Sequence, residues 1–169
     1  VSDNLTKKEL TAYEGIEDKD LDKGGIFAIF LGYYLKWDPL ETKRVAVKNG
    51  FRVAKQPRTG LYNFADIDDS FISIHHWMKW YKFGFTRLHD NLSIEIRNGR
   101  ITRDEAIKII KNTGDTTPRK DIDKFCQFGK ISSKEFWDIC EKFRNDEIWS
   151  RYNDKWQIEN YIIKDWIWT

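Results

Sequence analysis

Apolar residues recur at helical spacing between residues 67 and 83. Intervals of four, three, four and three positions separate them, which places them on one face of a helix. The residues on this face are Ile67, Phe71, Ile74, Met78 and Tyr81. The pattern predicts a helix over Ile67–Phe83 that Gly84 interrupts, with a cluster of aspartates at its start.

Capping signals predict the other helices. A Ser or Thr followed three residues later by Glu can cap a helix N-terminus reciprocally. This pairing occurs at Thr6–Glu9, Thr102–Glu105 and Ser132–Glu135. Asp38-Pro39 predicts a helix over about residues 39–49, and Thr117-Pro118 predicts one that Gly129 ends. A short helix is expected around Leu92–Ile96.

The longest apolar stretch, Ile26–Leu35, has the aromatic and β-branched residues typical of a buried strand. Because the predicted helix 39–49 follows it directly, the two predict a strand–helix unit of an α/β sheet. A single strand cannot form a sheet, so this one would need partner strands outside the chain. The sequence therefore predicts a mainly α fold, with one strand–helix unit followed by a helical region.

Composition limits the classes of protein to consider. Aromatic residues make up 15% of the 169 residues, and disordered chains are poor in such residues. No apolar stretch is long enough to span a membrane, and the first residues lack the pattern of a signal peptide. We therefore expect a folded, cytoplasmic protein. Val1 in place of Met suggests a piece of a longer protein.

The charge is nearly balanced but unevenly distributed. The 29 basic and 27 acidic residues give a net charge of +2, which argues against a general nucleic-acid binder. Basic residues are concentrated in 36–58 and 79–111, where they could contact an anionic ligand or simply face water. Cys126 and Cys140 lack metal-ligand spacing, so no metal site is expected.

Candidate chemistry concentrates between residues 75 and 103. The phosphate-binding, dinucleotide-binding, zinc-protease and serine-hydrolase motifs GxxxxGK[ST], GxGxxG, HExxH and GxSxG are absent. The neighbours His75 and His76 would point about 100° apart on a helix, which favours a structural role for the pair. Near the helix break at Gly84 lies a set of groups that bind phosphate or carboxylate: Lys82, Arg87, His89, Asp90, Asn91, Arg97, Asn98 and Arg100.

Several segments together resemble the C-terminal half of the N-acetyl sugar amidotransferases. Three carry most of the resemblance: Tyr34–Pro39, Lys82–Arg87 and Ile94–Glu105. Further matches in the same order are Gly60–Asp68, His75-His76, Phe136-Trp137 and Phe143–Asn145. The resemblance covers about Ile26–Trp156.

The resemblance implies a PP-loop ATP pyrophosphatase of bacterial surface polysaccharide (LPS or O-antigen) or nonulosonic acid biosynthesis, the latter including pseudaminic and legionaminic acid. Such enzymes use ATP, with Mg²⁺, to activate a sugar acetamido group, and ammonia then converts it to an acetamidino group. A partner glutaminase supplies the ammonia through a cyclase-like subunit. The expected substrate is an anionic or nucleotide-linked sugar.

The family's ATP-binding SGGxDS loop and Cys-rich segment precede the matched region, and neither occurs in this chain. The chain is therefore interpreted as the C-terminal portion of such an enzyme, inactive without the N-terminal PP-loop domain. Residues 1–50 would be the remnant of that domain, with strand 26–35 as the last of its sheet. Residues 51–156 would form a helical domain and 157–169 a Trp-rich tail.

Site roles are assigned from what such a reaction requires. Fixed cations would stabilise the leaving group and the substrate, and Lys82, Arg87, Arg97 and Arg100 are the candidates. His75 and His89 are candidate proton-transfer groups, which Asp90 or Asp38 could orient. The alternative for Arg97 and Arg100 is a structural turn paired with Asp90 or Glu95.

Two other functions remain open at this point. The basic segments could belong to a helical nucleic-acid-binding appendage, although no RNA-binding motif is present. The aromatic segment Trp149–Trp168 could instead be a protein-interaction surface that docks the ammonia-supplying subunit or a second copy of the chain.

Overall fold

A computed structural model describes residues 6–168. It divides into two units, residues 1–37 and 38–169. The second unit begins at Asp38, which forms an ion pair with Arg100 of the same unit. The predicted helix 39–49 therefore belongs to the second unit.

The first unit contains only short helices. They are α1 (Lys7–Leu10), the 3₁₀ helix η1 (Thr11–Tyr13), α2 (Asp18–Gly24) and α3 (Leu31–Tyr34). The predicted capping box forms at α1, where the Thr6 hydroxyl accepts a bond from the Glu9 amide and the Glu9 carboxylate accepts one from the Thr6 amide.

The prediction of a buried strand over Ile26–Leu35 is wrong. Residues 26–30 belong to no helix or strand, and α3 follows them. The side chains are exposed, with Phe27 at 81% and Phe30 at 90% of their full accessibility. A strand is held by hydrogen bonds to a neighbouring strand. Among the described residues, the two strands that exist pair only with each other, so this segment has no partner.

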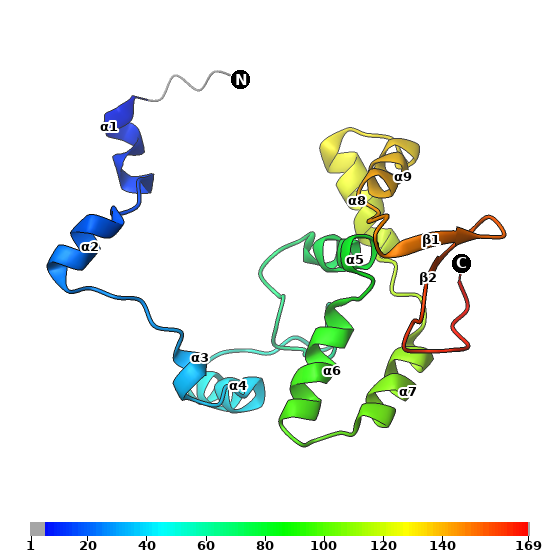
Figure 1. Cartoon of the computed structure of the whole chain (residues 1–169), viewed down its shortest axis with the longest axis horizontal. Coiled ribbons are helices and arrows are strands. Elements are labelled where there is room, and N and C mark those ends of the chain that lie inside the picture. The colour runs from blue at the N-terminus through cyan, green and yellow to red at the C-terminus, as the bar shows by residue number, and fades with distance from the viewer. Residues whose placement is uncertain (1–5, 169) are drawn as a thin grey trace. The chain divides into compact units, whose positions relative to one another are not determined.

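The second unit is a group of helices followed by a hairpin (Figure 1). Its helices are α4 (Pro39–Lys48), α5 (Ile72–Phe83), α6 (Arg87–Arg97), α7 (Arg103–Thr113), α8 (Arg119–Gly129) and α9 (Ser133–Lys142). Strands β1 (Trp149–Tyr152) and β2 (Lys155–Ile158) pair antiparallel, with Trp149 opposite Ile158. The hairpin crosses the boundary predicted at residue 156. The fold is mainly α, as predicted.

Local signals located most helix ends correctly. Capping boxes form at Thr102 and Ser132, and Gly84 ends α5 in the left-handed conformation with φ 70°. Two starts differ from the prediction. Helix α5 begins five residues late, because Asp66 adopts φ 58° and is held in a loop. Helix α6 begins at Arg87, because Thr86 and His89 form a capping box that includes a histidine in place of Glu.

Two hydrophobic clusters hold the second unit together. In the first, α5 packs against α8 and α9. Its buried members are Ile74, Trp77, Tyr81, Ile122, Cys126, Phe136 and Cys140. In the second, α6 packs against α7 and the C-terminal segment, which is the part of the chain after β2 (residues 159–168). The buried members of this cluster are Leu88, Leu92, Ala106, Ile110 and Ile163. Among the described residues, no helix has the length and apolar character needed to cross a lipid bilayer.

The capping box of α9 tests whether capping residues stabilise the helix ends of this domain. The Ser132 hydroxyl accepts a bond from the Glu135 amide at 3.1 Å, and the Glu135 carboxylate accepts one from the Ser132 amide at 2.7 Å. We expect Ser132→Ala to lower the free energy of unfolding by about 1 kcal/mol. Urea unfolding followed by circular dichroism measures this. The control is Ser133→Ala, at the next position, and equal effects of the two substitutions would contradict the prediction.

Candidate functional site

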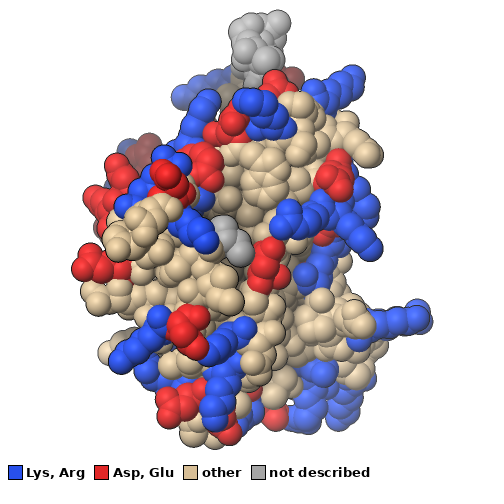
Figure 2. All heavy atoms as spheres, turned by 90° about the vertical axis from the view of Figure 1, so that its right-hand side faces the viewer, with Lys and Arg blue, Asp and Glu red and all other residues tan. Residues whose placement is uncertain are grey.

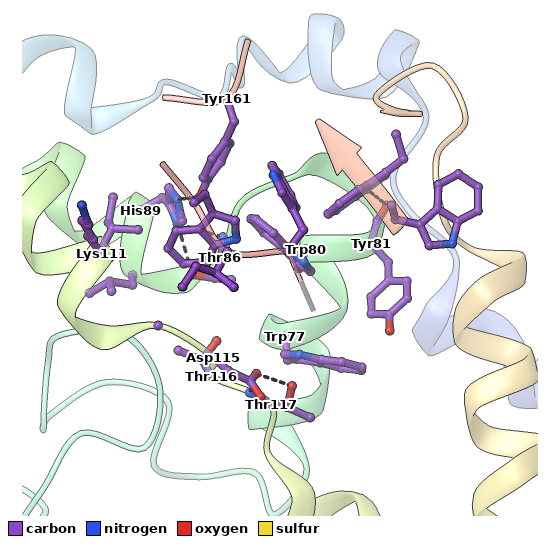
Figure 3. Close-up of a pocket in the computed structure, with 18 of the residues that line it drawn as sticks. Trp77, Trp80, Tyr81, Thr86, His89, Lys111, Asp115, Thr116, Thr117 and Tyr161 are labelled. Atoms are coloured by element: carbon purple, nitrogen blue, oxygen red, sulfur yellow. Dashed lines mark hydrogen bonds between the residues drawn. The ribbon is translucent and has the colours of Figure 1, made fainter. Parts of the chain in front are cut away.

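A cavity of about 570 Å³ opens in the second unit, and aromatic rings form much of its wall. We call it the aromatic pocket. Its rings come from four parts of the chain, namely α5, α9, the hairpin and the C-terminal segment (Figure 3). They are Trp77, Trp80, Tyr81, Trp137, Trp149, Trp156, Tyr161, Trp166 and Trp168. A cavity of this size accommodates a small organic ligand.

Trp80 is the centre of the ring packing. Its ring centroid lies 5.1 Å from that of Trp149 and 5.7 Å from that of Tyr161. Trp166 and Trp168 follow at 6.1 and 6.2 Å. These are the separations of favourable aromatic pairs. The C-terminal segment therefore folds back onto α5, and its tryptophans build the pocket wall.

Arg144 fixes the hairpin side of the pocket. Its guanidinium lies 4.3 Å from the ring centroid of Tyr81, 4.7 Å from that of Trp149 and 4.9 Å from that of Trp156. Glu141 accepts two hydrogen bonds from the same group, at 2.7 and 2.9 Å. A cation held among three rings and a carboxylate limits the movement of those rings.

The opposite side of the pocket is polar. Asp115, Thr116 and Thr117 lie in the loop between α7 and α8, across the pocket from Tyr161 (Figure 3). Asp115 accepts a bond from the Thr117 amide at 2.8 Å, and Arg119 lies 3.3 Å from the same carboxylate. The pocket thus offers rings on one side and carboxylate and hydroxyl groups on the other.

His89 lines the aromatic pocket in a structural role. Its Nδ1 accepts a bond from the Thr86 amide at 3.1 Å, so the proton of the neutral ring lies on Nε2, which is 3.2 Å from the Tyr161 hydroxyl. Burial lowers the pKa of His89 to about 4. Near neutral pH the ring is therefore uncharged, and it links the start of α6 to the C-terminal segment.

A second, smaller cavity of about 200 Å³ adjoins the first. We call it the basic pocket. It shares Trp77, Thr86, Leu88 and Thr116 with the aromatic pocket. Three basic side chains line it (Arg58, His76 and Arg87), together with the hydroxyls of Thr59, Ser73, Thr86, Thr113 and Thr116. Its lining contains no carboxylate among the described residues.

Asp66 holds the basic pocket together from outside its lining. The carboxylate accepts bonds from Thr59 Oγ1 at 2.7 Å and from Arg87 Nε at 3.1 Å. His76 Nε2 lies 3.2 Å away. Burial alone would raise the pKa of Asp66, but the Thr59 hydrogen bond and the Arg87 charge outweigh it and hold the pKa below its usual value. Burial lowers the pKa of His76, against the effect of Asp66.

Comparison with protein families identifies the chain. Residues 58–162 match the family model described as LPS biosynthesis protein WbpG-like, C-terminal domain. The chain belongs to this family. The match confirms the family resemblance seen in the sequence and that the matched part is C-terminal. No curated protein shows a significant match to the chain. Both pockets of this WbpG-like domain lie mostly within the matched residues.

The WbpG-like domain does not bring the predicted site residues together. Arg87 lines the basic pocket and His89 the aromatic pocket. Asp90 forms an ion pair with Lys79. His75 is exposed on α5, with its ring against that of His76.

The remaining predicted cations lie outside both pockets. Lys82 is exposed, with its ammonium 4.8 Å from the Phe143 ring centroid, and Arg97 is exposed with Nε bonded to the Ser93 carbonyl at 3.4 Å. Arg100 makes two bonds to Glu95, at 2.5 and 2.8 Å. Its pairing with Glu95 is the structural alternative considered from the sequence.

Sequence reasoning missed three residues in or beside the basic pocket. The sequence places Arg58 in a loop and Asp66 at a helix start, and it favours a structural role for His76. Asp66 and His76 lie in two matched segments of the family resemblance, Gly60–Asp68 and His75-His76, whereas no signal marks Arg58. No group of three or more His, Cys, Asp or Glu residues in the described chain could hold a metal ion.

The buried His89 predicts a pH dependence of stability. Unfolded His89 takes up a proton near pH 6.5, whereas the folded residue does so only near pH 4. Stability is therefore lost as pH falls below 6.5, by about 2 kcal/mol between pH 7.5 and pH 5. Burial of His76 adds to this loss.

Urea unfolding at the two pH values measures the effect. His89→Gln, which keeps a side-chain acceptor for the Thr86 amide, should remove most of the loss. The assignment to His89 is wrong if His89→Gln and the parent protein lose equal stability.

Proposed function

We propose that this domain is the C-terminal, sugar-binding part of an ATP-dependent amidotransferase of bacterial LPS biosynthesis. The whole enzyme converts a sugar acetamido group into an acetamidino group. The observation that carries the proposal is the match of residues 58–162 to an LPS biosynthesis C-terminal domain. Residues 58–162 also contain most of the aromatic pocket, which combines aromatic rings with a few polar side chains.

In the proposed reaction the acetamido oxygen first attacks the α-phosphorus of ATP, and pyrophosphate leaves. Ammonia then forms a new C–N bond to the activated amide carbon. The C–O bond breaks, and AMP leaves with the oxygen. Among the described residues, no group of three or more His, Cys, Asp or Glu side chains could hold a metal ion. We therefore assign ATP and its metal to an N-terminal PP-loop domain, and ammonia supply to a glutaminase with a cyclase-like subunit, all in the cytoplasm.

The aromatic pocket is suited to hold the sugar. A pyranose ring has an apolar face of C–H groups that packs against aromatic rings, and a polar edge of hydroxyls that forms hydrogen bonds. Trp80 and Tyr161 offer the first kind of surface, and Asp115, Thr116 and Thr117 the second. Few, localised polar groups in a mostly apolar cavity are typical of small-molecule sites.

The exposed segment 26–35 is the proposed contact to the PP-loop domain. Most of its side chains are large and apolar, and Phe27, Phe30 and Tyr33 are each more than 80% exposed. An apolar run of this kind on a monomer indicates an interaction site. Trp166 and Trp168, by contrast, pack against Trp80, so the C-terminal segment is a weaker candidate for a docking surface.

The charge distribution does not favour the nucleic-acid alternative. On the face shown in Figure 2, Lys and Arg side chains are interspersed with Asp and Glu. Many basic side chains of residues 79–111 are also paired with carboxylates, including Lys79, Arg87 and Arg100. A continuous basic stripe, which a phosphate backbone requires, is not formed by these residues.

The first test measures ATP-dependent conversion of an acetamido sugar by the natural protein. The protein is purified from its own cells, together with an N-terminal domain that is either part of the same polypeptide or bound to it. We expect a mass above 20.3 kDa for the polypeptide or its complex. With ATP, an acetamido sugar nucleotide and ammonia, AMP should form together with a product in which NH replaces the amide oxygen, as detected by mass spectrometry. Absence of AMP and product across acetamido sugars would overturn the proposal.

A further inference from the structure

The basic pocket has the composition of an oxyanion site. Arg58, His76 and Arg87 supply cationic or proton-donating groups, and the lining has no carboxylate among the described residues. The Thr59 and Ser73 hydroxyls donate to Asp66 and Asp121, which border the pocket. Guanidinium groups bind phosphate and carboxylate with good geometry. The first residues of α6, Thr86 to Leu88, also line the pocket, and the positive end of an eleven-residue helix favours an anion.

His76 provides an independent indication of a ligand. Both ring nitrogens are buried, and neither makes a hydrogen bond of good geometry to any described residue. Its Nε2 is close to Asp66, but its Nδ1 is left without a partner. Buried polar groups are nearly always hydrogen-bonded, so an unpartnered one beside a cavity indicates that something is missing there.

Both guanidiniums have donors to spare. Arg87 uses Nε and Nη2 for Asp66, at 3.1 and 3.3 Å. Arg58 uses Nη2 for the Ser70 carbonyl, and the same atom lies 3.6 Å from Asp121. In the described part of the chain no hydrogen bond engages Nη1 of either residue. The carboxylates thus hold the guanidiniums in place while leaving donors for a ligand.

The position of the basic pocket links it to the aromatic pocket. Trp77, Thr86, Leu88 and Thr116 line both cavities, so a ligand in one lies next to the other. We infer that the basic pocket binds an oxyanion, a phosphate or a carboxylate, attached to the sugar held in the aromatic pocket. This inference rests on the proposed sugar-binding role, and it assigns Arg58, His76 and Arg87 to recognition of the charged group.

Binding to the chain itself tests the inference without any need for turnover. Isothermal titration compares neutral N-acetylglucosamine, UDP-N-acetylglucosamine, N-acetylglucosaminuronic acid and UDP. We expect at least one of the two anionic sugars to bind about tenfold or more tightly than the neutral sugar. The two anionic sugars distinguish a diphosphate from a ring carboxylate as the source of the charge, and UDP alone should bind more weakly than the sugar that carries it.

Substitutions locate the charged group. Arg87→Gln and His76→Gln should each lower affinity for the preferred anionic sugar about tenfold and leave affinity for the neutral sugar unchanged. Arg103→Gln is the matched control, since Arg103 is exposed at the start of α7 and lines neither pocket. If Arg87→Gln disturbs folding, as seen in its thermal unfolding, Arg58→Gln replaces it.

Several outcomes would overturn the inference. These are failure of every sugar to bind, equal binding of neutral and anionic sugars, or equal effects of the pocket and Arg103 substitutions. Its failure is distinguishable from that of the proposed reaction. Selective binding without AMP formation would support the oxyanion site and contradict the proposed amidotransferase reaction. AMP formation without selective binding would support the reaction and contradict the oxyanion site.

Discussion

Burial of helix α5 on several sides at once is the constraint on which the rest of the second unit depends. One side, with Ile74, Trp77 and Tyr81, packs against α8 and α9 in the main core. Another carries Trp80, which must be covered by the hairpin and the C-terminal segment. Both pockets border α5, because residues of this helix line each of them.

Ion pairs with carboxylates decide where the basic side chains of residues 79–111 lie in the second unit. The basic residues that cluster along the sequence separate in space, because each meets a different partner. Arg87 turns to Asp66, Lys79 to Asp90, and Arg100 to Glu95. Water solvates a partly buried charge poorly, so such a charge is stabilised by an oppositely charged side chain next to it. The cations that remain close to a cavity are therefore few, and their positions are well defined.

The two units differ in what they leave exposed. In the second unit the C-terminal tryptophans Trp166 and Trp168 pack against Trp80 and line the aromatic pocket. In the first unit the apolar segment 26–35 remains exposed, since no described strand pairs with it. This division fits a domain that holds a ligand by itself and depends on another domain for the rest of the chemistry. The family assignment and the local structure thus support the same proposed role.

The sequence by itself determined most helices of the second unit and many of their ends, because caps and helical periodicity act over four or five residues. Ser132 with Glu135, Asp38 with Pro39, and Gly84 all stand where the structure needs them. It also determined the family, through several motifs in the same order. It could not reveal the site. His76, Arg58 and Asp66 come together only when a loop folds onto α5 and α6. The prediction of a strand over residues 26–35 required a partner strand, and no described strand pairs with this segment. Side-chain neighbours far apart in the chain, and the presence of a strand's partner, are properties of the tertiary structure alone.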